Sequence, residues 1–163
     1  MSNIIAVANM QEYFYTALQQ AICNRRVAVS QEAQAYVVQL LCTFSRCECA
    51  YAGTEYNEQF AAATLLQRAQ NADAPEAMHT FKHVGDSCLY IAGLFEESLT
   101  RRGLTRSYYV DIGELAYYHL SALLSQKTAS TAGLYQQLSR QFPQLVHALD
   151  ALGGNDEPLL STA

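Results

Sequence analysis

The sequence predicts an all-α fold. The expected architecture is a single-domain bundle of about five to seven helices around a central antiparallel hairpin of residues 73–102 and 106–125. Apolar residues recur at the three- and four-residue spacing of amphipathic helices along most of the chain. Only residues 4–8 have the composition of a strand, and an isolated strand of that length cannot form a sheet. The length of 163 residues is also typical of one domain with its own core.

The first three helices follow from this apolar spacing and from helix-capping residues. Asn9 followed by Glu12 resembles a capping box and predicts the start of the first helix. Ser30 is the expected cap of the second helix. Residues 46–56 contain few periodic apolar positions and are expected to form a loop. A third helix is expected over residues 58–70.

The central hairpin has the clearest end signals. Asp73 is a suitable cap for the fourth helix, and Pro75 stands in its first turn, where proline loses no hydrogen bond. Gly103 is expected to adopt the left-handed conformation that ends this helix. Thr105 or Ser107 is expected to cap the fifth helix.

The helical pattern continues over residues 129–152. Pro143 must break or kink this last region, because proline cannot donate the helical hydrogen bond. The pair of glycines that follows is expected to end it. We therefore expect one helical domain over residues 1–154 and a disordered tail over residues 155–163.

Composition restricts the kinds of function. Only 15% of the residues are charged and the net charge is −5, whereas an average domain has about 25% charged residues. The acidic balance excludes general nucleic-acid binding, which requires a basic surface. No apolar run approaches the roughly 18 residues of a membrane span, and a signal peptide is not recognisable, so we expect a cytoplasmic protein. Low charge and 11 tyrosines favour a homo-oligomer or a protein partner, because interface cores are rich in tyrosine and poor in charge.

Five cysteines are expected to be mostly free thiols in a cytoplasmic protein. Cys23 and Cys88 fall on apolar helix faces, where cysteine behaves as a small hydrophobic residue. Cys42, Cys47 and Cys49 form the pattern C-x4-C-x-C. This spacing differs from that of a zinc knuckle, and the second cysteine pair of such sites is missing. The role of these three cysteines therefore stays open.

The fourth helix is expected to have an apolar face and a polar face. Six apolar residues form the core-facing stripe: Phe81, Val84, Cys88, Ile91, Phe95 and Leu99. The opposite face carries a polar stripe: His79, His83, Asp86, Tyr90 and Glu97. Three glycines lie inside the hairpin helices: Gly85, Gly93 and Gly113. Glycine in a helix interior costs roughly 1 kcal/mol relative to alanine, so these residues indicate close approach of packed helices.

The polar stripe has three interpretations. In the first it is a solvated or interface face of the helix. In the second His79, His83 and Asp86 bind a divalent metal, since two histidines four residues apart can reach one ion. The position after His79 holds no glutamate base, and the second Glu-x-x-His pair of a di-iron bundle is absent. In the third the stripe lines a pocket of unspecified type. Apart from the divalent metal of the second interpretation, no cofactor is expected.

The fifth helix is apolar over more than half of its circumference, which is typical of a helix central in the fold or shared with a second subunit. Tyr109 and Asp111 are its candidate ligand or interface residues. Asp111 and Asp86 could meet across the hairpin, although pairing of an acid with an arginine or a tyrosine hydroxyl is the more economical arrangement. His119 is expected in the core. No nucleophile or phosphate-binding motif is recognisable, so no catalytic residue is assigned.

Two patterns stand out in the hairpin: FxxxGDxxLxxxGLF over residues 81–95 and YYxxxGxxAY over residues 108–117. Together they resemble the core of a widespread group of short, uncharacterised bacterial helical proteins, over about a third of the chain. The resemblance implies a bacterial origin and a stable helical unit. It implies no activity and supplies no catalytic residues.

Two functional hypotheses follow from the sequence. The first is a non-enzymatic helical interaction or regulatory module that self-associates through residues 73–124. The second is a sensor that binds a metal or small ligand on the face formed by His79, His83, Asp86 and Tyr90. The two hypotheses differ in whether that face is free to receive a ligand.

Overall fold

The structure, a computed structural model, describes residues 2–46, 62–101 and 103–155. Within these ranges the chain forms eight α-helices, a terminal π-helix and no strand, which confirms the all-α prediction. The helices are α1 (Ser2–Arg25), α2 (Gln31–Arg46), α5 (Ala62–Gln70), α6 (Ala74–Leu94), α7 (Glu96–Arg101), α8 (Arg106–Leu124), α9 (Ala129–Arg140), α10 (Phe142–Asp150) and the π-helix η1 (Ala151–Asn155).

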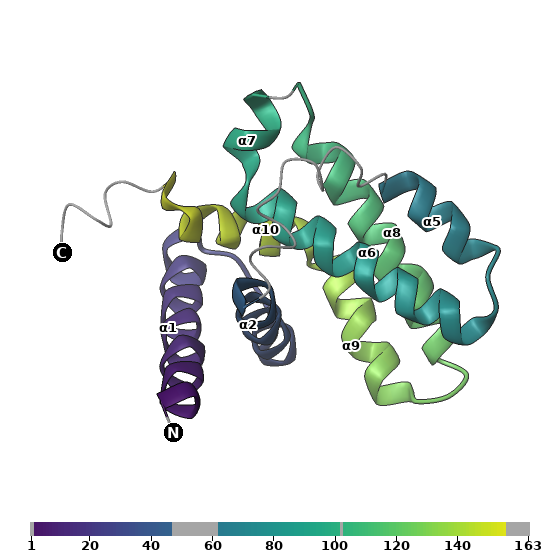
Figure 1. The fold of residues 1–163 in the computed structure, drawn as a ribbon, viewed down its shortest axis with the longest axis horizontal. Coiled ribbons are helices and arrows are strands. Elements are labelled where there is room, and N and C mark those ends of the chain that lie inside the picture. Colours follow the sequence, from purple (N-terminus) through teal and green to yellow (C-terminus); the bar gives the residue numbers. More distant parts are fainter. Residues whose placement is uncertain (1, 47–61, 102, 156–163) are drawn as a thin grey trace.

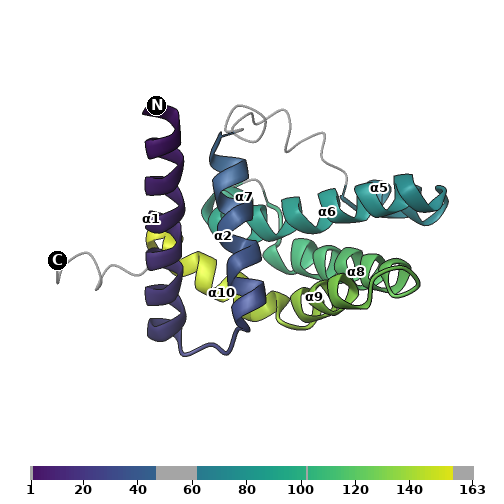
Figure 2. The same ribbon diagram turned by 90° about the horizontal axis from the view of Figure 1, so that it is seen from below.

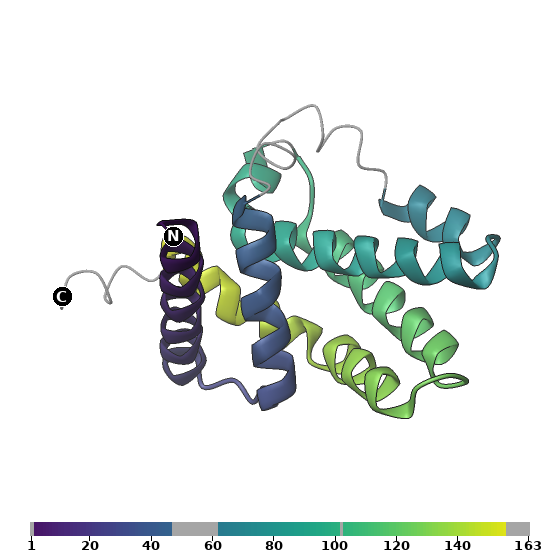
Figure 3. The ribbon, with the colours of Figure 1, turned by 60° about the horizontal axis from the view of Figure 1, so that its bottom comes forward.

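Helices α6 and α8 make the most extensive contact between any two described helices (Figure 1). Gly85 of α6 lies against Tyr117 of α8, and Ala92 lies against Arg106, so the contacting residues run in opposite order along the two helices. Helix α5 packs on α6, and α9 packs on α8. Helices α1 and α2 stand together at one end of the molecule (Figure 2). Helix α10 contacts both α1 and α6 and so connects the two groups (Figure 3).

Several helix ends lie where the sequence predicts them. The hydroxyl of Ser30 accepts a hydrogen bond from the backbone N–H of Ala33 and caps α2. Gly103 has φ +73°, the left-handed conformation expected after the fourth helix. The region around Pro143 divides into α9 and α10, and the proline stands in the first turn of α10.

Other predicted ends are wrong. The first helix begins at Ser2, so Asn9 lies inside it and is not a cap. Asp73 is the exception, because it stands at the N-cap position of α6 as predicted, although its side chain makes no capping hydrogen bond. The predicted fourth helix is two helices, because the backbone of Phe95 leaves the helical conformation (φ −120°, ψ 30°). The glycine pair does not end the last helix, because α10 ends at Asp150 and the glycines belong to η1.

Parts of some expected elements lie outside the described residues. These are most of the loop at residues 46–56, the start of the third helix, Cys47, Cys49 and the tail beyond residue 155.

The core lies between α6, α8 and α10. The predicted apolar stripe of the fourth helix is buried in it, except for the half-buried Phe95. The glycines at the centre of the hairpin allow this packing, because a Cβ atom on Gly85 would meet the Tyr117 ring and one on Gly93 would meet Leu149. The close approach is therefore between a helix backbone and side chains of neighbouring helices.

Three further residues test the sequence-based core assignments. Cys88 is fully buried, as predicted, whereas Cys23 is exposed and its assignment to an apolar face is wrong. His119 is half-buried, where its ring stacks on Phe81 with centroids 5.3 Å apart. None of the helices in the described ranges is both long enough and apolar enough to cross a membrane.

Candidate functional site

The carboxylate of Asp86 is the centre of the predicted polar stripe, and it is 7% exposed. Its Oδ1 atom accepts hydrogen bonds from the hydroxyls of Tyr36 (2.5 Å) and Tyr117 (2.6 Å). Its Oδ2 atom accepts one from the ammonium of Lys82 (2.7 Å). The donors come from α2, α8 and the preceding turn of α6, so one carboxylate connects three helices. Both carboxylate oxygens are occupied by donors of the chain itself.

The tyrosines around Asp86 are held as hydrogen-bond donors. Burial raises the pKa of Tyr36 and of Tyr117, and the negative charge of Asp86 raises the pKa of both further. Tyr135 of α9 packs edge-on against Tyr36 at 5.5 Å between centroids, and burial raises its pKa as well. All three phenols therefore stay protonated at neutral pH. A tyrosine hydroxyl was one of the two partners that the sequence favoured for this acid over Asp111, which lies exposed on α8.

The space beside this cluster is small. A hollow of about 100 Å³ lies between α2 and α6, next to Lys82 and Asp86. Ligand sites usually have volumes of about 300–1,000 Å³. The geometry of Asp86 therefore indicates a polar connection between helices.

The predicted metal ligands are not assembled. His79 is exposed, His83 is half-buried, and the oxygens of Asp86 face tyrosines and a lysine. Burial lowers the pKa of His83, and the nearby charge of Asp86 opposes that effect. No group of three His, Cys, Asp or Glu residues within the described ranges is arranged to hold a metal ion.

The remaining candidates are spread over different environments. Tyr90 is buried, and its ring contacts those of Phe44 and Phe95 at 4.7 and 5.3 Å between centroids. Glu97 is exposed on α7, beyond the break at the end of α6. Tyr109 is buried in the core. The predicted polar stripe is therefore not one open face, because its middle part is covered by α2 and by aromatic side chains.

A second buried carboxylate was missed by the sequence analysis. Asp150, also 7% exposed, accepts hydrogen bonds from Arg106 of α8 (2.7 Å) and Arg25 of α1 (3.3 Å). Arg106 also donates to the carbonyl of Ala92 (2.9 Å) and pairs with Glu96 (2.9 Å). The available signal was a lone acid in the apolar run LVHALDAL, where a carboxylate needs a cationic partner.

An exposed row of residues runs along α8 to its C-cap and carries three of the six exposed large hydrophobic side chains among the described residues. It consists of Tyr108, Asp111, Leu115, Tyr118, Ala122 and Ser125, all exposed, and is called the α8 row below. Leu115 is 45% and Tyr118 is 56% exposed. The members are spaced alternately by three and four residues, as in the contact seam of a coiled coil.

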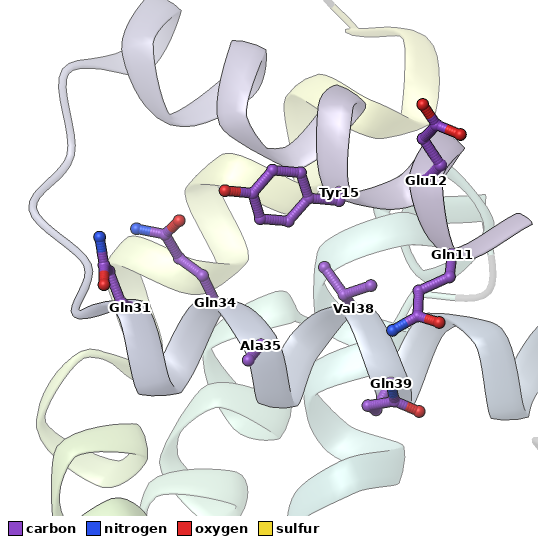
Figure 4. Close-up of a pocket in the computed structure, with 8 residues that line it drawn as sticks. All are labelled: Gln11, Glu12, Tyr15, Gln31, Gln34, Ala35, Val38 and Gln39. Carbon is purple, nitrogen blue, oxygen red and sulfur yellow. The ribbon is translucent and has the colours of Figure 1, made fainter. Parts of the chain in front are cut away.

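A groove of about 600 Å³ lies between α1 and α2 (Figure 4). It is lined by Gln11, Glu12, Tyr15, Gln31, Gln34, Ala35, Val38 and Gln39. The ring of Tyr15 lies between the two helices, near the amide of Gln34 (Figure 4). The sequence analysis noted the abundance of glutamine only as low charge, because the register that brings α1 beside α2 is set by tertiary packing.

Neither family models, nor curated proteins, nor solved structures yield a match to this chain. The resemblance to short bacterial helical proteins therefore stays a prediction, and functional arguments depend on the site geometry.

Proposed function

We propose that the chain is a non-enzymatic helical interaction module of a bacterial cytoplasmic protein, and that it self-associates through the α8 row. The observation that carries the proposal is the concentration of exposed large hydrophobic side chains. Among the described residues there are six of these, and four lie on α8 or directly before it: Leu104, Tyr108, Leu115 and Tyr118.

Most of the hairpin is already used inside the chain. The opposite row of α8 packs on α6, α9 and α10 and includes Tyr109, Ala116 and Tyr117. Within the described part of residues 73–124, the α8 row carries three of the four exposed large hydrophobic side chains, and Leu104 is the fourth. Apolar surface rimmed by polar residues is typical of interaction sites.

A second copy of the chain is the partner that this row favours. In an antiparallel pair of α8 helices, Leu115 of one copy lies beside Tyr118 of the other at the centre of the seam. In this register Asp111 of one copy lies opposite the exposed Ala122 of the other copy. This arrangement keeps the two Asp111 carboxylates apart, at opposite ends of the contact.

Sedimentation velocity at tens of micromolar tests the proposal. We expect a dimer for the unmodified chain and a monomer for Leu115→Glu, because truncation or charging of a central interface residue weakens binding by more than about tenfold. Tyr13→Glu is the matched control, since Tyr13 is 67% exposed on α1, away from the α8 row.

The orientation of the pair has its own test. Ala122→Lys should strengthen an antiparallel dimer, because the new cation lies opposite Asp111 of the other copy, and Ala122→Glu should weaken it, because two carboxylates then face each other. A monomer for the unmodified chain, or equal effects of the substitutions at Leu115 and Tyr13, would contradict self-association through this row.

A further inference from the structure

Glu114 lies at the edge of the α8 row, on the side of α8 that faces α9. It directly precedes Leu115, and the hydroxyl of Ser139 on α9 donates a hydrogen bond to its backbone carbonyl (2.8 Å). The side chain of Glu114 is half-buried, whereas Asp111, a member of the α8 row, is exposed. Residues three apart on a helix are neighbours on its surface, so two carboxylates stand side by side along the apolar seam.

This pair of acids has no compensating cation within the described ranges. The salt bridges there include neither Asp111 nor Glu114. Helix α9 packs against this edge of α8, and its only charged residue is Arg140, which forms no salt bridge with either acid. Burial raises the pKa of Glu114, and the negative charge of Asp111 raises it further. The structure therefore holds a half-buried acid in a field of its own sign.

The antiparallel pairing of α8 helices brings two copies of Glu114 together. A two-fold axis relates the copies, so the same edge of each α8 lies on the same side of the contact. Because Leu115 and Tyr118 mark its centre, the two Glu114 residues are offset by the rise of five residues, about 7.5 Å along the seam. Packed helix axes are about 8–10 Å apart, and the carboxylates can therefore approach to on the order of 10 Å.

The other copy supplies no cation at this edge. The position that faces Glu114 across the seam is Ser121, which is buried and uncharged. His119 lies at the opposite edge of α8, where its ring stacks on Phe81 of its own chain. Association therefore places two carboxylates near each other and removes water from them, without a positive charge to offset either effect.

We propose that pH controls self-association through the α8 row, and that Glu114 is the residue that responds. At high pH the two ionised Glu114 side chains repel each other across the seam and weaken the contact. When the pH falls, these carboxylates take up protons and the contact tightens. The dimer then holds more protons than two separate chains, so its stability must increase with falling pH. This regulation rests on the self-association proposed above.

Sedimentation equilibrium near pH 7.5 and near pH 5 tests the proposal. Near pH 7.5 we expect Glu114→Gln to tighten the dimer about threefold or more, because it removes the repulsion of two unit charges on the order of 10 Å apart. Near pH 5 the difference between this variant and the unmodified chain should shrink, because the carboxyl is then largely protonated. Glu12→Gln on α1 changes the net charge equally at an exposed position, and its dimer should follow the unmodified chain at both pH values.

The two proposals fail in different ways. Equal dissociation constants of the unmodified chain and Glu114→Gln near pH 7.5 would overturn control by Glu114 and leave self-association intact. A monomer for every chain at both pH values would overturn self-association as well.

Mixed dimers test the proximity of the two Glu114 side chains directly. Glu114→Lys places a cation at this edge, so its mixture with the unmodified chain should form more heterodimer than random pairing gives, because opposite charges then face each other. Native mass spectrometry of the mixture near pH 7.5 measures the proportions. Glu12→Lys is the matched control and should pair at random. Random pairing of Glu114→Lys would contradict the placement of the two acids on one edge of the contact.

Discussion

Single residues at the hairpin centre are constrained by the space left to them. A Cβ atom on Gly93 would lie 2.5 Å from Cβ of Leu149, and the Leu149 atom cannot move without its backbone. Gly133 of α9 has nothing within 4 Å of the corresponding position. Close packing therefore requires glycine at position 93 and does not require it at position 133, although both residues lie in helices.

Gly93→Ala is expected to lower the free energy of unfolding by about 1–3 kcal/mol, the usual range for overpacking. Helix propensity alone would raise it by roughly 1 kcal/mol, and we expect that gain in the matched control, Gly133→Ala. Chemical denaturation of both variants measures the difference. A stabilised Gly93 variant would show that Leu149 yields and that the packing argument is wrong.

Helices in this protein are joined by a few buried charges as well as by apolar contact. Arg106 at the start of α8 binds Asp150 at the end of α10 and the carbonyl of Ala92 near the end of α6. A cation beside the last carbonyls of a helix also complements the helix dipole. Arg106 thus holds three helix ends together at one point.

Arg106→Met is expected to destabilise the protein by on the order of 3 kcal/mol, because removal of one partner leaves a buried carboxylate poorly compensated. Asp150→Asn in the same background should recover part of the loss, since the uncompensated charge is then absent. Thermal and chemical unfolding of the single and double variants provides the measurement. If the double variant instead loses the sum of the two single-variant losses in unfolding free energy, the two residues do not interact.

The sequence predicts elements better than their ends and better than the site. Ser30, Gly103 and Pro143 act through local backbone chemistry, so their effects could be predicted. The break at Phe95 was not predicted, because the residue at that position is neither a proline nor a glycine. A tyrosine hydroxyl was an expected partner of Asp86, but the sequence did not indicate that Tyr36, 50 residues earlier, would supply one. Helical periodicity carries no information on such distant partners.

At the scale of the whole molecule, burial of one histidine couples stability to pH. The pKa of His83 is lowered, chiefly by burial. The unfolded chain therefore takes up a proton near the ordinary histidine pKa of about 6.5, while the folded chain does so only at lower pH. The unfolded state holds more protons in that interval, so stability must fall as the pH drops through about 6.5.

We expect His83→Gln to flatten the dependence of unfolding free energy on pH as the pH falls below about 6.5. Urea denaturation at several pH values measures the slope, and His79→Gln is the control because His79 is exposed. An equal slope in the unmodified protein and in the His83 variant would show that another group dominates this interval.

The bond between Arg25 and Asp150 joins residues 125 positions apart. A ribosome adds about 5–20 residues per second, so roughly 6–25 s separate the synthesis of the two partners. During that interval α1 exists without α10, the helix that it contacts through this pair. Helix α1 can pack on α2 as soon as both have been made, but the ion pair that ties it to α10 forms only after Asp150 has been added.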